Sequence, residues 1–133
     1  MAVTTLNFLI LLAIGTSGFI GAILRFILSG WVQRHTTLLF PFGTLFVNVL
    51  GSFLIGFLFL YFQEINLSPH QKALAITGLL GALTTFSTFS LETILLFQEN
   101  MWGKALLNIG LNITLALFAT YLGMLLFRKV YGG

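Results

Sequence analysis

The chain has 133 residues, of which 58% are hydrophobic and only 7% are charged. A soluble domain carries about 25% charged residues, so these few charges cannot cover a water-facing surface and lipid is the expected solvent. The absence of cysteine excludes a disulfide framework. The net charge of +3 rests on six basic and three acidic residues, too few for the clustered basic face of a nucleic-acid-binding protein.

Four apolar stretches are long enough to cross a membrane, which takes roughly 20 helical residues for a ~30 Å hydrocarbon core. They cover about residues 6–28, 42–62, 72–97 and 105–127. Because the polar connections between them are short, successive helices are expected to be antiparallel neighbours. The start of the chain lacks the basic residues of a signal peptide and is interpreted as part of the first span. The sequence thus predicts a single all-α integral membrane domain over residues 1–133.

Apart from Arg25, which lies inside the first span, the Lys and Arg residues at the ends of the spans and between them give almost no positive-inside bias. With four spans they divide three to two between the sides, Lys72, Arg128 and Lys129 against Arg34 and Lys104. Two interpretations stay open. The orientation is fixed by a feature that the sequence does not reveal, or the chain inserts both ways and pairs as an antiparallel dimer.

Polar and ionisable side chains inside the spans are costly and often functional, and three in the first three spans are considered first. Arg25, near the end of the first span, can snorkel to the interface, pair with a carboxylate or hold a loop. Asn48 can donate hydrogen bonds to a passing anion or bond helices together. Glu92 is either a buried acid that is neutral or paired, or a gating or structural partner.

The third span holds the most unusual segment, in which Gly78 and Gly81 precede the run TTFSTFS at 84–90. Glycines weaken a helix, and hydroxyl side chains can satisfy the backbone groups that a break sets free. We therefore expect this helix to be broken near its middle, with carbonyls exposed that can hold a cation. The alternative is a small-residue packing face, the role expected of Gly15, Gly18 and Gly21 in the first span.

Phe86 and Phe89 are three residues apart and share a helix face. An aromatic ring is positive at its edge, so two edges turned toward a path favour an anion, with Thr85 and Thr88 as nearby hydroxyl donors. The chain has fifteen phenylalanines, most of which are expected to face lipid or pack between helices, so composition alone favours packing for these two.

No motif of an enzyme is present. The sequence contains no His cluster, carboxylate pair, nucleophile elbow, P-loop or dinucleotide fingerprint. The two histidines, His35 and His70, fall in separate connections. We therefore do not expect an enzyme.

Three motifs in this order resemble those of the small fluoride channel family, Fluc, also called CrcB. They are GFIGAILRF at 18–26, GTLFVNVLGS at 43–52 and GLLGALTTFSTFSLE at 78–92. The resemblance implies a passive fluoride channel of the bacterial inner membrane that exports fluoride from the cytoplasm. It also implies an antiparallel, dual-topology homodimer with two pores and a structural sodium ion (Na+) at the dimer interface.

The resemblance also implies roles for individual residues of the anion path. Phe86 and Phe89 match the pore phenylalanines, and Asn48 matches the asparagine beside them. Ser87 and Thr88 match a track of hydroxyl side chains next to the phenylalanines.

Four further residues match family positions outside the anion path. Gly81 and Thr84 match positions whose backbone carbonyls, from both subunits, hold the sodium ion. Arg25 and Glu92 match positions to which the resemblance gives no role.

The chain departs from the family pattern at two places. The first-span motif has Ser17–Gly18 in place of two glycines and ends in Phe26 in place of tyrosine, which should disturb packing little. A pore-facing serine of the fourth helix aligns with Ala116. The fourth span instead carries Asn108, Asn112 and Thr114, and the sequence leaves open whether Asn112 or Thr114 replaces the serine.

Two rival functions are weighed against the channel. A small multidrug-type, proton-coupled antiporter shares four spans and dual topology, but it depends on an acid in the first span, where this chain has Arg25 and no acid. A non-transporting subunit of a larger assembly would conduct nothing when purified.

Overall fold

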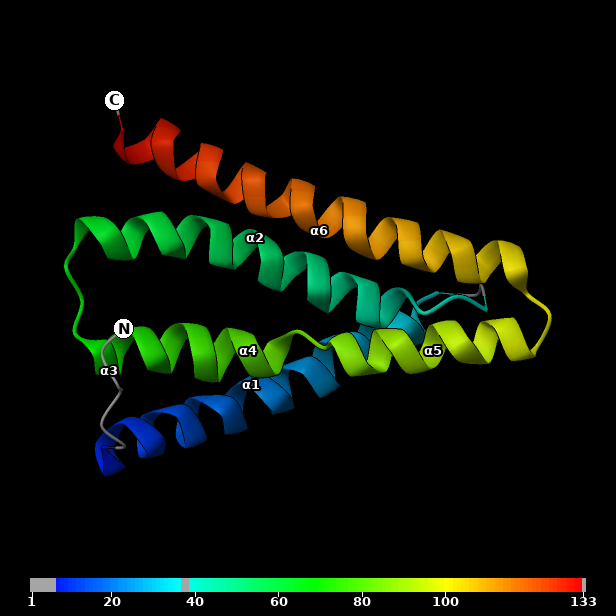
Figure 1. The fold of residues 1–133 in the computed structure, drawn as a ribbon, viewed down its shortest axis with the longest axis horizontal. Coiled ribbons are helices and arrows are strands. Elements are labelled where there is room, and N and C mark those ends of the chain that lie inside the picture. Colours follow the sequence, from blue (N-terminus) through cyan, green and yellow to red (C-terminus); the bar gives the residue numbers. More distant parts are fainter. Residues whose placement is uncertain (1–6, 37–38, 133) are drawn as a thin grey trace.

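The computed structural model describes residues 7–36 and 39–132, and these residues form helices and turns without a strand. The elements are α1 (Phe8–Arg34), α2 (Phe42–Glu64), α3 (Pro69–Lys72), the π-helix η1 (Ala73–Leu80), α4 (Gly81–Leu83), α5 (Phe86–Gln98) and α6 (Trp102–Tyr131). The elements α3, η1, α4 and α5 follow one another as a single interrupted span (Figure 1). The all-α class and the four apolar helices are therefore confirmed. Residue 6, at which the first predicted span begins, lies outside the described residues.

Each of the four helical spans is long and apolar enough to cross a membrane. They extend beyond the apolar stretches seen in the sequence, and α1 continues past Leu28 to Arg34. Hydropathy marks only the part of a helix that lies in hydrocarbon, whereas backbone hydrogen bonding carries the helix on into the polar headgroup region.

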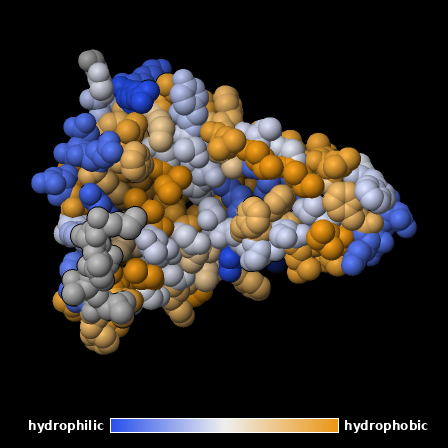
Figure 2. All heavy atoms as spheres, viewed as in Figure 1, coloured by the Kyte–Doolittle hydropathy of each residue, from blue (hydrophilic) through white to orange (hydrophobic). Residues whose placement is uncertain are grey.

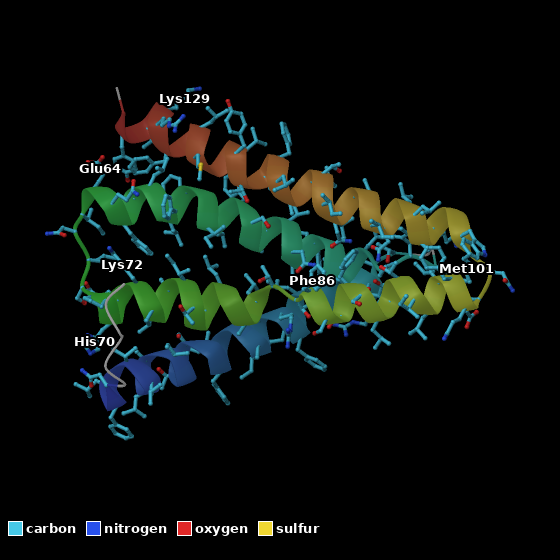
Figure 3. All side chains as sticks on the ribbon, viewed as in Figure 1. Glu64, His70, Lys72, Phe86, Met101 and Lys129 are labelled. Carbon is cyan, nitrogen blue, oxygen red and sulfur yellow. The ribbon has the colours of Figure 1, made fainter. Side chains whose placement is uncertain are left out.

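The helices form an elongated bundle in which α2 packs along α6, and α1 crosses under η1 and α4 (Figure 1). Glu64, His70, Lys72 and Lys129 gather at one end, and Met101 marks the other (Figure 3). Hydrophobic side chains dominate the face between the two ends (Figure 2). In the apolar window of α1 only 11% of the residues are buried within the chain, which leaves most of this helix to lipid or to another protein surface.

Close backbone contact between α1 and η1 depends on glycine. A Cβ atom on Gly21 would collide with the Leu79 carbonyl, and one on Gly78 would collide with the side chain of Ser17. Ser17 is buried here because Gly78 lies opposite, so the serine that departs from the family pattern is accommodated. A Cβ atom on Gly15 would meet no other element within 4 Å, so within one chain the glycine packing face of α1 does not extend to Gly15.

The third span breaks where the sequence predicted, at two extended residues. Thr84 has φ −85° and ψ 156°, and Thr85 has φ −150° and ψ 112°. The preceding π-helix was not expected. There the Gly81 N–H donates to the carbonyl of Ile76, five residues back, so the backbone is already wider than an α-helix before it opens.

Candidate functional site

The side chain of Asn48 replaces the missing helical partner of the broken backbone. The Thr85 N–H donates to Asn48 Oδ1 at 2.8 Å, and Asn48 Nδ2 donates to the Thr85 carbonyl at 3.2 Å. Both partners are backbone groups of fixed polarity, so they determine which atom of the amide is oxygen and which is nitrogen. The helix-bonding interpretation of Asn48 is therefore observed, because this side chain joins α2 to the third span.

These two hydrogen bonds leave the carbonyl of Gly81 without its helical donor. In a continuous helix the N–H of Thr85 would donate to the carbonyl four residues earlier, which is that of Gly81, but here it donates to Asn48. At Thr88, too, a side-chain oxygen replaces the backbone acceptor of a continuous helix. The Thr88 N–H donates to Thr85 Oγ1 at 3.2 Å and leaves the Thr84 carbonyl without its helical donor. The two carbonyls named by the cation-site prediction are thus the two that lose these bonds.

Thr85 also caps the start of α5. Besides accepting from the Thr88 N–H, its hydroxyl donates to Thr88 Oγ1 at 2.9 Å and lies 3.4 Å from Ser87 Oγ. The 13-residue helix α5 therefore begins at the break, and a helix N-terminus carries partial positive charge. At the break, the end of α4 with its free carbonyls therefore lies next to the electropositive N-terminus of α5.

A hollow of about 530 Å³ lies beside the break and is lined by residues of the break and of α2, η1, α4, α5 and α6. We call it the central hollow. Its lining residues are Asn48, Gly51, Ser52, Ile55, Ile76, Leu80, Gly81, Thr84, Thr85, Phe86, Phe89, Asn112, Ile113 and Ala116. It brings together the predicted pore residues Asn48, Phe86 and Phe89 and the predicted cation-site residues Gly81 and Thr84.

Phe86 and Phe89 lie close together but differ in burial. Their ring centroids are 5.4 Å apart and the rings are inclined by 59°. Phe89 is buried, whereas 80% of Phe86 is exposed. Phe86 lies near the middle of the molecule, where the ribbon between α4 and α5 loses its helical turns (Figure 3).

A chain of buried amides runs from the central hollow into α6. Asn48 Nδ2 donates to Asn112 Oδ1 at 3.1 Å, and Asn112 Nδ2 donates to Asn108 Oδ1 at 2.9 Å. Asn108 Nδ2 then donates to Thr93 Oγ1 at 2.9 Å. Of the two candidates for the missing serine, Asn112 lines the hollow, while the exposed Thr114 bonds to Gly110 of its own helix.

A second, smaller hollow of about 280 Å³ lies on the other side of Thr85. Its lining residues are Ala22, Arg25, Phe26, Ser29, Thr44, Val47, Thr85 and Thr88. The hydroxyl of Thr44 donates to Glu92 Oε1 at 2.7 Å, so Thr44 links the surroundings of Arg25 to those of Glu92. Glu92 Oε2 is buried without a hydrogen-bond partner in the described part of the chain.

Sequence reasoning missed two polar residues of this region. Thr44 and Thr93 were not predicted as site residues, because a lone threonine in an apolar span usually bonds to a carbonyl of its own helix. A signal did exist for the amides, since Asn108 and Asn112 lie four residues apart and hence on one helix face. Among the predicted residues, Ser87 is exposed and belongs to neither hollow, and Thr88 lies on the second.

Comparison with known proteins places this arrangement in a family. The family described as CrcB-like protein, Camphor Resistance (CrcB), matches residues 12–124. A protein of a Sulfurovum species named fluoride-specific ion channel FluC is 64% identical over 123 residues, which cover 92% of this chain and 97% of that protein.

Two other proteins of the same name are similar over comparable lengths. The one from a Nitratiruptor species is 55% identical over 96% of this chain and 99% of its own length. The one from Shewanella frigidimarina is 54% identical over 90% of this chain and 97% of its own length. The chain therefore belongs to the CrcB family of membrane ion channels.

Proposed function

We propose that this chain is a passive, fluoride-selective channel that exports fluoride from the bacterial cytoplasm across the inner membrane. Relatives that cover at least 90% of the chain are named fluoride-specific ion channels. One observation carries the proposal, namely that the central hollow places Asn48, Phe86 and Phe89 beside a helix break in mid-span.

The groups around the central hollow suit an anion. Fluoride is small and strongly hydrated, so a narrow path must replace the water that the ion loses, through several weak sites that also let it leave. The ring edges of Phe86 and Phe89 are positive, and the N-terminus of α5 adds partial positive charge at the same place. Neither feature attracts a cation.

Asn48 would serve fluoride by exchanging a hydrogen bond. Both hydrogens of its amide are engaged, one with the Thr85 carbonyl and one with Asn112 Oδ1. A passing fluoride ion can take over the hydrogen given to Asn112, while the bond to Thr85 keeps the amide in place. Before the ion arrives, the Asn48 N–H is already in position and is paired with Asn112. It is therefore not left unsatisfied in hydrocarbon, where each unsatisfied polar group costs several kcal/mol. Hydroxyls of Thr85, Ser87 and Thr88 would continue the path.

A second copy of the chain would complete the site. Phe86 stands 80% exposed and Gly81 is exposed as well, so the central hollow opens on the surface of a single chain. We propose an antiparallel, dual-topology homodimer in which each chain helps to close a pore, giving two pores. The three-to-two division of basic residues permits insertion in both orientations.

The freed carbonyls of Gly81 and Thr84 would hold a structural sodium ion. Among the residues that the structure describes, no group of three or more His, Cys, Asp or Glu side chains could bind a metal, whereas the two freed carbonyls offer oxygen atoms. Carbonyls at the end of a half-helix are a known environment for Na+. Two oxygens are too few to replace the water of a cation, whereas two from each of two chains form a reasonable site.

Purified protein in liposomes should release fluoride when a potassium ionophore balances the charge, and it should release chloride far more slowly. A fluoride electrode follows the first ion and a chloride electrode the second. No fluoride release, as a non-transporting subunit predicts, or equal release of both ions would refute the channel. Release that requires a proton gradient or a cationic drug would indicate the antiporter instead.

Phe86→Ile should reduce the rate of fluoride release roughly five- to tenfold, since the lost ring-edge contacts, worth about 1 kcal/mol, act directly on the ion. Phe118→Ile is the control, because Phe118 is also an exposed phenylalanine but lines neither hollow. Size-exclusion chromatography checks that both variants keep their assembly state. A wild-type rate in Phe86→Ile would show that the ring edges are not used.

Charge variants should separate the two orientations. Apart from Arg25 inside the first span, Arg34→Gln with Lys104→Gln leaves Lys and Arg residues on one side only, and Lys72→Gln with Arg128→Gln and Lys129→Gln leaves them only on the other. Each set expressed alone should give little fluoride release, because antiparallel pairs cannot form, and co-expression should restore it. Full activity of either set alone, or one orientation of terminal tags in the wild type, would refute dual topology.

The dimer should melt at a higher temperature in detergent with Na+ than with N-methyl-D-glucamine as the only cation. An ion that binds only the folded assembly stabilises it, by about 2.7 kcal/mol at a concentration 100 times its Kd. The melting temperature is read from intrinsic tryptophan fluorescence. Equal melting temperatures in the two cations would contradict a structural sodium ion.

A further inference from the structure

The amide chain that starts at the central hollow does not end in α6 but returns to the third span. Thr93 accepts from Asn108 and donates its own hydroxyl hydrogen to the carbonyl of Phe89 at 2.7 Å. The chain therefore begins at the backbone of Thr85 and ends at the backbone of Phe89. It ties together α2, α6 and both sides of the first turn of α5.

From the Thr85 N–H to the Phe89 carbonyl, each successive group donates to the next, and the chemistry of the two ends fixes that direction. The one bond that runs back is from Asn48 Nδ2 to the Thr85 carbonyl. At one end the Thr85 N–H can only donate, so Asn48 must turn its oxygen toward it. At the other end Thr93 has a single hydroxyl hydrogen, which goes to the Phe89 carbonyl, so Thr93 must accept from Asn108 Nδ2. Asn112 fits between them in one orientation only.

The side chains in the middle of this row of hydrogen bonds are closed to water. Asn108 is 1% exposed, Thr93 is 5% exposed and Asn112 is 7% exposed. In such surroundings a wrongly oriented amide would leave a buried donor or acceptor unpaired, at substantial cost. Asn112 Nδ2 also donates to the backbone carbonyl of Asn108 at 2.9 Å, which adds a second, unambiguous acceptor on the α6 side.

Of the four side chains that form this amide chain between the backbones of Thr85 and Phe89, only two reach the path proposed for the ion. Asn48 and Asn112 line the central hollow, whereas Asn108 and Thr93 do not. The orientation imposed from α5 turns the oxygen of Asn112 toward Asn48, whose hydrogen covers it. The amide oxygen of Asn112, which would repel an anion, is thereby masked until an ion takes over this hydrogen, and the donor side of Asn48 is held between Thr85 and Asn112.

We propose that Thr93 and Asn108 are positioning residues that set, from outside the hollow, the direction in which Asn48 and Asn112 present their amides to the ion. The proposal rests on the fluoride channel function proposed above and concerns residues that do not contact the path. Without the Thr93 hydroxyl, Asn108 Nδ2 loses its acceptor, so the amide of Asn108 is free to turn over. Its NH2 group would then face the NH2 group of Asn112, which keeps only the backbone carbonyl of Asn108 as an acceptor. The amide of Asn112, and with it the pairing to Asn48, would be held less firmly.

The test compares Thr93→Val, which keeps the shape but removes the hydroxyl, with Thr93→Ser, which keeps the hydroxyl. Each is reconstituted at less than one dimer per liposome on average. In this regime the fraction of liposomes that empty reports folded channels, and the rate constant of emptying reports conduction by one channel. Thr93→Val should lower the rate constant roughly three- to tenfold, the range expected for one lost hydrogen bond, and Thr93→Ser should keep it near the wild-type value.

A structural control separates positioning from folding. Phe127 is buried and packs against Phe57 and Tyr61 of α2 without touching the amide chain. Phe127→Leu should lower the fraction of active liposomes and leave the rate constant unchanged. If Thr93→Val does the same, or changes neither quantity, Thr93 is structural only and the inference is wrong.

A second variant covers the case in which Thr93→Val does not fold. Asn108→Leu removes the buried amide that Thr93→Val would leave unpaired, and it leaves Asn112 Nδ2 with the backbone carbonyl of residue 108 as the one acceptor of its former two. Because Asn112 is then held less firmly, this variant should also lower the rate constant, and a wild-type rate constant would overturn the inference. Absence of fluoride release from the wild type would overturn the channel function itself, and this inference with it.

Discussion

The exchange of hydrogen bonds between Asn48 and Thr85 is the constraint on which the rest of the site depends. A helix cannot open in the middle of a membrane unless other groups satisfy its backbone, because lipid offers no partner. The Asn48 amide supplies one acceptor and one donor to the same residue. It thereby acts as a short piece of neighbouring backbone, and it lets two residues adopt extended conformations where a helix would otherwise continue.

This one exchange gives the break two ends of opposite character. The N–H groups diverted to Asn48 and to the Thr85 hydroxyl are those that would have satisfied the carbonyls of Gly81 and Thr84. On that side the backbone offers oxygen atoms, which suit a cation. On the other side α5 begins, and its first N–H groups suit an anion. A cation site and an anion path can therefore share one short segment without competing for the same atoms.

The sequence was sufficient for features that depend on composition and local spacing. The four spans follow from hydropathy, and the break follows from glycines and hydroxyls in a lipid setting. The π-helix Ala73–Leu80 left no such trace, since its residues are mostly ordinary helix formers. The link from Asn112 through Asn108 to Thr93 was also out of reach, because spacing tells which residues share a helix face but not which helix that face meets.

The proposed pairing of two chains follows from the same constraint as the hydrogen bonds between Asn48 and Thr85. Gly81 is exposed, and its carbonyl lacks a helical donor, so lipid would leave a polar group unsatisfied at mid-depth. Nothing else in the described chain covers this position, and a second copy would bring an identical break to the same depth. The break itself does not distinguish a parallel from an antiparallel pair, since it lies near the middle in both. The near balance of basic residues between the two sides favours the antiparallel pair, because it removes the charge bias that would hold every chain in one orientation.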